Sequence, residues 1–127
     1  MSGAGAAIPA TLVTGPSASR REAAIAAALA ESTLHHNGAS ALILEGLPDG
    51  KPLLEPSDSL LIARIAPGCL CCAGNLVMRV TLNRLLRQRP KQLFIGVASD
   101  EHLGQLRSWL SSAPYDQLLK LTPDRHS

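Results

Sequence analysis

Short apolar runs alternate along this chain with longer segments in which apolar residues recur at helical spacing. Continuous apolar runs of this length, bounded by Gly, Pro or Asn, are typical of strands that are covered on both faces. The predicted strands are 10–14, 39–45, 60–66, 92–98 and 118–122. The predicted helices are 20–35, 75–89 and 100–111. The segment 46–59 is rich in Pro and Gly, and we expect it to be a loop.

The first two predicted helices carry local boundary signals. Ser19 and Glu22 have the S-x-x-E spacing of a capping box, which predicts that each side chain binds the backbone N–H of the other residue. Asn37 and Gly38 are residue types that commonly follow a helix. Pro90 ends the second helix because it has no backbone N–H to donate.

The alternation of apolar strands and amphipathic helices predicts an α/β fold. We expect a three-layer sandwich in which a mostly parallel sheet of about five strands has helices on both faces. A length of 127 residues suits one domain, predicted over 10–122, with a flexible lead over 1–9 and a tail over 123–127. Functional groups in such folds lie at the carboxyl ends of the strands.

Composition and charge exclude several classes of protein. The net charge is +2, only 2% of the residues are aromatic, and Lys and Arg are scattered, which argues against a nucleic-acid partner. No stretch reaches the roughly 18 apolar residues of a membrane span, and the first residues lack the basic start of a signal peptide. The 3 cysteines are too close together for a disulfide framework, so we expect a reducing, cytoplasmic setting.

The string Gly68-Cys69-Leu70-Cys71-Cys72 carries the main candidate chemistry. Thiolates are soft ligands that favour zinc and similar ions, and a tetrahedral ion would need a fourth ligand from water, a histidine or a second chain. His102 is predicted at the appropriate end of the sheet for that role. The alternative is that the three cysteines are small buried apolar residues, because free cysteine is commonly buried.

This cysteine string, between an apolar strand and a leucine-bearing helix, resembles the GCICC segment of the CobW-like (G3E) P-loop GTPases. These are metal-insertion and metal-homeostasis proteins, and the resemblance covers roughly residues 11–122 in order and spacing. It implies a P-loop NTPase-like fold. It also implies that Cys69, Cys71 and Cys72 bind zinc, cobalt or nickel.

The P-loop itself departs from the family pattern. A P-loop reads G-x-x-x-x-G-K-[ST], and the aligned residues 15–22 of this chain read GPSASRRE. Gly15 is kept, Arg20 replaces the second glycine, and Arg21 replaces the lysine. Glu22 stands where a hydroxyl would bind magnesium, and a carboxylate there opposes the phosphates by on the order of 1 kcal/mol or more per close pair.

Two further nucleotide-binding features are missing. Gly96 stands where the family has a strand-end Glu, and no [NT]-K-x-D guanine-reading motif occurs. Asp100 and Glu101 are the only candidate substitutes for that Glu. Gly15, Ser19, Arg20, Arg21 and Glu22 are therefore interpreted as a remnant of a nucleotide site, and the helix is expected to cap itself with Glu22. The sequence argues against GTP and Mg²⁺ binding and against GTPase activity.

The leading hypothesis is a metal-binding module, an accessory in metal homeostasis whose ligand is zinc, cobalt or nickel. One alternative is a structural or interaction module with inert cysteines, which would pair with a protein partner or with itself through its sheet edge or its second helix. That helix region carries basic residues that form either a solvated face or a docking patch for an acidic partner. They are Arg79, Arg84, Arg87, Arg89 and Lys91. A weak GTP-binding protein is the other alternative.

Overall fold

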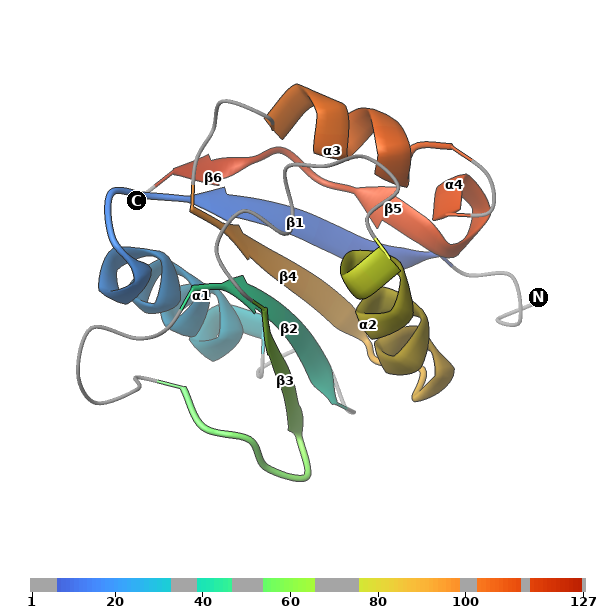
Figure 1. Cartoon of the computed structure of the whole chain (residues 1–127). Coiled ribbons are helices and arrows are strands. Elements are labelled where there is room, and N and C mark those ends of the chain that lie inside the picture. Colours follow the sequence, from blue (N-terminus) through green and yellow to red (C-terminus); the bar gives the residue numbers. More distant parts are fainter. Residues whose placement is uncertain are drawn as a thin grey trace.

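The computed structural model describes residues 7–32, 39–46, 54–65, 76–98, 103–112 and 115–126. The elements within these ranges form a single sheet with helices on both faces (Figure 1). Its strands are β1 (Ile8–Thr14), β2 (Ser40–Glu45), β3 (Leu60–Ile65), β4 (Gln92–Val97), β5 (Leu119–Leu121) and β6 (Arg125–His126). Its helices are α1 (Ala18–Ser32), α2 (Leu76–Arg87), α3 (Leu103–Leu110) and α4 (Tyr115–Leu118).

All strand pairings in the sheet are parallel. The strand order is β3-β2-β4-β1-β5, and β6 pairs with β1 further along the same strand. The central strands β1 and β4 pair in the register Thr11↔Phe94 to Thr14↔Val97, so their carboxyl ends are level. The predicted mostly parallel sheet of about five strands is confirmed.

The helices divide between the two faces of this sheet. α1 covers one face, and α2, α3 and α4 cover the other (Figure 1). β2 shows why its sequence is a continuous apolar run: Ala41 and Ile43 belong to the core under α2 and α3, whereas Leu42 and Leu44 belong to the core under α1. Successive side chains of a strand point to opposite faces, so a strand with two covered faces has no polar positions in its interior. The predicted three-layer sandwich is therefore confirmed.

The last part of the chain holds two elements that the hydrophobic pattern did not predict. α4 is a single turn, in which the Tyr115 hydroxyl donates to Asn83 Oδ1 at 2.9 Å and the Tyr115 ring lies 4.9 Å from that of Trp109. β6 comes directly after Asp124, which forms an ion pair with Arg107 of α3. The sheet thus includes Ile8 and residues 125–126, which lie on either side of the predicted range 10–122.

The end of α2 follows the prediction made from Pro90. The N–H groups of Gln88 and Arg89 donate to the carbonyls of Leu85 and Leu86, which is the tightened last turn of a helix end. Arg89 then takes a positive φ of 53°, a conformation that usually favours glycine or asparagine after a helix. The chain turns there into β4.

Candidate functional site

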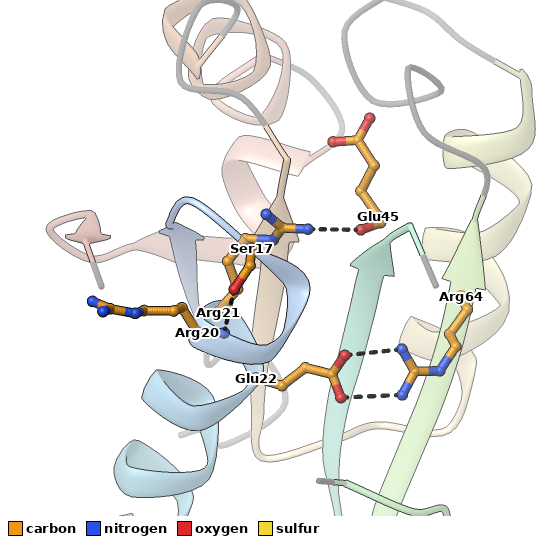
Figure 2. A network of polar contacts seen from close by, with 6 residues as sticks. All are labelled: Ser17, Arg20, Arg21, Glu22, Glu45 and Arg64. Atoms are coloured by element: carbon orange, nitrogen blue, oxygen red, sulfur yellow. Dashed lines mark hydrogen bonds and ion pairs between the residues drawn. The ribbon is translucent and has the colours of Figure 1, made fainter. Parts of the chain in front are cut away.

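The carboxyl ends of β1, β2 and β4 form the edge of the sheet where the sequence predicted functional groups. A loop of three residues, 15–17, leads from β1 into α1 at this edge. Several charged side chains lie beside it, and Figure 2 shows contacts that they make. Of the predicted remnant, Gly15, Ser19, Arg20, Arg21 and Glu22 all lie within the described residues.

The start of α1 differs from the predicted capping box. The helix begins at Ala18, and the Ser17 hydroxyl accepts a hydrogen bond from the Arg20 N–H at 3.2 Å. Ser17 is therefore the N-cap, and Ser19 lies within the first turn. The prediction that Ser19 and Glu22 cap each other is wrong. Arg20 is exposed, and its side chain points away from the other labelled residues (Figure 2).

The buried guanidinium of Arg21 lies across the ends of β1 and β2. It donates to the Gly15 carbonyl at 3.0 Å and to the Glu45 carbonyl at 3.3 Å, and the residue is only 7% exposed. The Arg21 N–H itself donates to the Ser17 carbonyl at 3.1 Å. Arg21 thus binds its own loop through both its side chain and its backbone.

Glu22 forms a paired ion contact with Arg64 of β3. Its two carboxylate oxygens accept hydrogen bonds from the Arg64 guanidinium at 3.1 and 3.2 Å (Figure 2). The Glu22 side chain is 3% exposed and that of Arg64 is 22% exposed. The expectation that Glu22 reaches back over the helix end is wrong, because a full positive charge on a neighbouring strand binds a carboxylate more strongly than backbone N–H groups do.

The buried carboxylate of Glu45 was not singled out from the sequence. Its Oε1 accepts a hydrogen bond from the Ala98 N–H at 2.7 Å, so it links the end of β2 to the end of β4. Glu45 is 5% exposed. Gly46 follows it with a φ of 90°, which favours glycine, and donates to the Ile65 carbonyl at 2.9 Å. The sequence feature that could have identified Glu45 is a charged residue at the end of an otherwise largely apolar strand.

Gly96 lies inside the packed layer between β4 and α1. A Cβ added there would lie 3.3 Å from Leu44 Cδ2 and 3.8 Å from Ile25 Cδ1. The position aligned with the strand-end Glu of the resembling family is thus surrounded by apolar side chains. An acidic side chain at this position would have no polar partner among these neighbours.

The predicted metal ligands Cys69, Cys71, Cys72 and His102 lie outside the described residues. The same holds for Asp100 and Glu101. Within the described ranges, no group of three or more His, Cys, Asp or Glu side chains could hold a metal ion. No helix in those ranges is both long enough and apolar enough to span a membrane.

One curated protein is similar to this chain over part of its length. Over 70 residues, the chain is 39% identical to the zinc chaperone YeiR of Escherichia coli (strain K12). The matched stretch covers 54% of this chain and 21% of YeiR, so it spans about a fifth of that relative. No protein-family model matches the chain. No solved structure matches it either. The similarity to a zinc chaperone supports the resemblance to metal-homeostasis proteins.

Proposed function

We propose that this chain is a metal-binding domain that serves zinc homeostasis and has no GTPase chemistry. The observation that carries the proposal is the 39% identity to a zinc chaperone over 70 residues, in a chain that also contains a G-C-L-C-C string. The ion is bound as cargo rather than as a catalytic group. Free thiolates require a reducing environment, so we assign the protein to the cytoplasm.

The proposed ligands are the thiolates of Cys69, Cys71 and Cys72, the 3 cysteines of the chain. Zinc commonly takes four ligands, and a site with three protein thiolates leaves one position for His102, water or a second chain. A site with an open or exchangeable position suits a protein that passes its ion on. Cobalt and nickel are the alternative ions.

The first argument against nucleotide binding is that the aligned backbone N–H groups are already used. A P-loop holds phosphates with the N–H groups of an open loop and of the helix start. The Arg20 and Arg21 N–H groups instead bind the Ser17 side chain and carbonyl, and Pro16 has no N–H. The first turn of α1 therefore begins where the phosphate loop would continue.

The second argument concerns the side chains that would bind phosphate and magnesium. The Arg21 guanidinium is bound to two carbonyl oxygens rather than directed outward. Both oxygens of Glu22 are bound to Arg64. A triphosphate would have to break these contacts and would meet an additional negative charge, which supports the proposal that GTP is not bound.

Metal binding is tested by anaerobic titration with Co²⁺ and Zn²⁺, followed by mass spectrometry of the native protein. We expect one ion per chain or per dimer, with cobalt–thiolate charge-transfer bands that disappear when Cys69, Cys71 and Cys72 are replaced by serine. His102→Ala should keep the thiolate bands and change the ligand-field bands if the imidazole is the fourth ligand. No stoichiometric metal at micromolar protein would refute the proposal and favour the module with inert cysteines.

Nucleotide binding is tested on the same protein by calorimetry and thermal denaturation. We expect that millimolar GTP with Mg²⁺ gives no heat of binding and no shift in melting temperature. Binding with a micromolar Kd would contradict the proposed loss of nucleotide chemistry. Because the thiolate titration is a separate measurement, this result would leave the metal proposal intact.

A further inference from the structure

The outer edge of β3, with which no described strand pairs, is lined by a groove that the proposed metal function does not use. The groove has a volume of about 450 Å³. Its floor is the strand itself, since the successive residues from Leu60 to Arg64 all line it. Thr81 and Arg84 of α2, together with Gln88 in the turn that follows, form one wall. Pro56 and Ser57 close one end. A groove lined by consecutive strand residues faces the backbone edge of that strand.

The backbone groups that face this groove follow from the pairing of β3 with β2. In parallel strands, the N–H and C=O of one residue point to the same neighbour, and those of the next residue point away. Ser40 and Gly46 bind the carbonyls of Ser59 and Ile65, so odd-numbered residues of β3 face β2. The backbone groups of Leu60, Ile62 and Arg64 therefore face outward.

Within the described residues, only some of the backbone groups on this outward edge have hydrogen-bond partners. Leu60 exchanges two hydrogen bonds with Ser57, at 3.0 and 3.1 Å, which closes the first position. The N–H and C=O groups of Ile62 and Arg64 have no such partner there, and no described strand pairs with this side of β3. Such an edge is a template for one further strand.

One exposed basic side chain, Arg84, lines the wall of the groove, and the segment that forms this wall is basic as a whole. Val77, Thr81, Arg84 and Gln88 recur at helical spacing and form one row along α2, in which Val77 is 48% exposed. Residues 76–98 contain five basic residues and no Asp or Glu. These five are all exposed, and none forms an ion pair with another described residue. They are Arg79, Arg84, Arg87, Arg89 and Lys91.

We propose that this edge binds an extended, acidic segment of a partner protein, which adds to β3 as a further strand and places a carboxylate against Arg84 of α2. The backbone of the segment would pair with Ile62 and Arg64, and alternate apolar side chains would fill the groove. The acidic residues Glu55 and Asp58 flank Pro56 and Ser57 in the chain, at the closed end of the groove. They would repel a carboxylate of the partner at that end, so we place the partner's carboxylates beside α2 instead.

Charge argues against a second copy of this chain as the occupant. Two β3 edges that paired across a two-fold axis would bring two α2 helices to the same face of a continuous sheet. The exposed Arg84 on each groove wall would then face the other copy, and like charges in contact oppose association. An acidic segment removes this repulsion and gains charge-assisted hydrogen bonds.

The test uses two short blocked peptides, one that alternates valine with glutamate and one that alternates valine with lysine. Each is titrated into the ¹⁵N-labelled full chain in which the three cysteines are serine, so that metal binding plays no part. We expect the acidic peptide to shift the amide signals of Ile62, Arg64 and the α2 row, and the basic peptide to shift none of them. Shifts located elsewhere, or equal binding of both peptides, would overturn the proposal.

Three variants separate the two parts of the recognition. Arg84→Glu on the groove wall should weaken binding of the acidic peptide about tenfold or more, whereas the matched reversal Lys120→Glu, at an exposed position of β5, should not change it. Ile62→Pro removes an outward N–H, which an edge strand tolerates, and should abolish binding while the far-ultraviolet circular dichroism is kept. Binding that is unaffected by Arg84→Glu would refute the docking model, as would a concentration-dependent dimer of the free chain measured by light scattering.

Discussion

Replacement of Arg64 by methionine is the sharpest test of the charge arrangement at the carboxyl ends of the strands. The substitution keeps most of the volume of the side chain but leaves the Glu22 carboxylate without its partner. The carboxylate is 3% exposed and loses two hydrogen bonds, of 3.1 and 3.2 Å. We therefore expect Arg64→Met to lower the free energy of unfolding markedly.

The magnitude follows from the burial of the two partners. Removal of one member of a buried ion pair costs about 3–5 kcal/mol, because an unpaired charge remains in the interior. The Arg64 side chain is 22% exposed, so water reaches the pair from one side, and we take the lower end of that range. A loss of about 3 kcal/mol corresponds to a fall in melting temperature of about 10 °C for a domain of this size.

The measurement is urea unfolding followed by the fluorescence of Trp109 and by circular dichroism. A matched control is Arg125→Met, whose partner Glu31 lies 3.9 Å away and whose ion pair is exposed on both sides, so its loss should cost about 0.5 kcal/mol or less. The double variant Glu22→Leu/Arg64→Met should come within about 1 kcal/mol of the native protein, because it leaves no unpaired charge. If Arg64→Met lowers the free energy of unfolding no more than Arg125→Met does, the Glu22–Arg64 pair does not stabilise the carboxyl ends of the strands.

Substitutions at three other positions test local features. Ser17→Ala should lower the free energy of unfolding by about 1 kcal/mol, and Ser17→Gly by only a few tenths, in urea titrations, because glycine is a tolerated N-cap. Arg89→Gly should raise the free energy of unfolding by about 0.5–1 kcal/mol, since the φ of 53° strains an L-residue. An unchanged urea midpoint of unfolding would contradict this expectation. Gly96→Ala should cost under about 1.5 kcal/mol if Leu44 yields, whereas Gly96→Glu should cost about 3 kcal/mol or more and restore no phosphate release from GTP.

The layers of the fold were predictable because the signals for them are local. β2 and β4 are strands of six residues, and the positions between their ends form continuous apolar runs, which is typical of a strand covered on both faces. Pro90 marks the end of α2 through its missing N–H. By contrast, α4 is one turn of four residues and β6 has two, so neither contains a full period of the hydrophobic pattern.

The charge contacts of the candidate site were less predictable because they join distant parts of the chain. Glu22 and Arg64 are 42 positions apart, and a capping-box rule considers only residues within one turn. The rule failed because the Glu22 carboxylate binds the Arg64 guanidinium of β3 instead of a backbone N–H in its own helix. Arg21 follows β1 closely in the chain, but its two carbonyl partners depend on where the loop and the end of β2 meet.

The contacts of Arg21 and Glu22 also bear on how this domain could change its function. A phosphate seated at residues 15–22 would have to replace the two Arg21 hydrogen bonds, which at about 1.5–3 kcal/mol each for a charged donor represent some 3 kcal/mol or more. It would also have to open the first turn of α1, where Ser17 binds two N–H groups. Single substitutions toward the P-loop pattern, such as Glu22→Thr, would free Arg64 without opening that turn. We therefore expect that such variants lose stability before they gain any affinity for GTP.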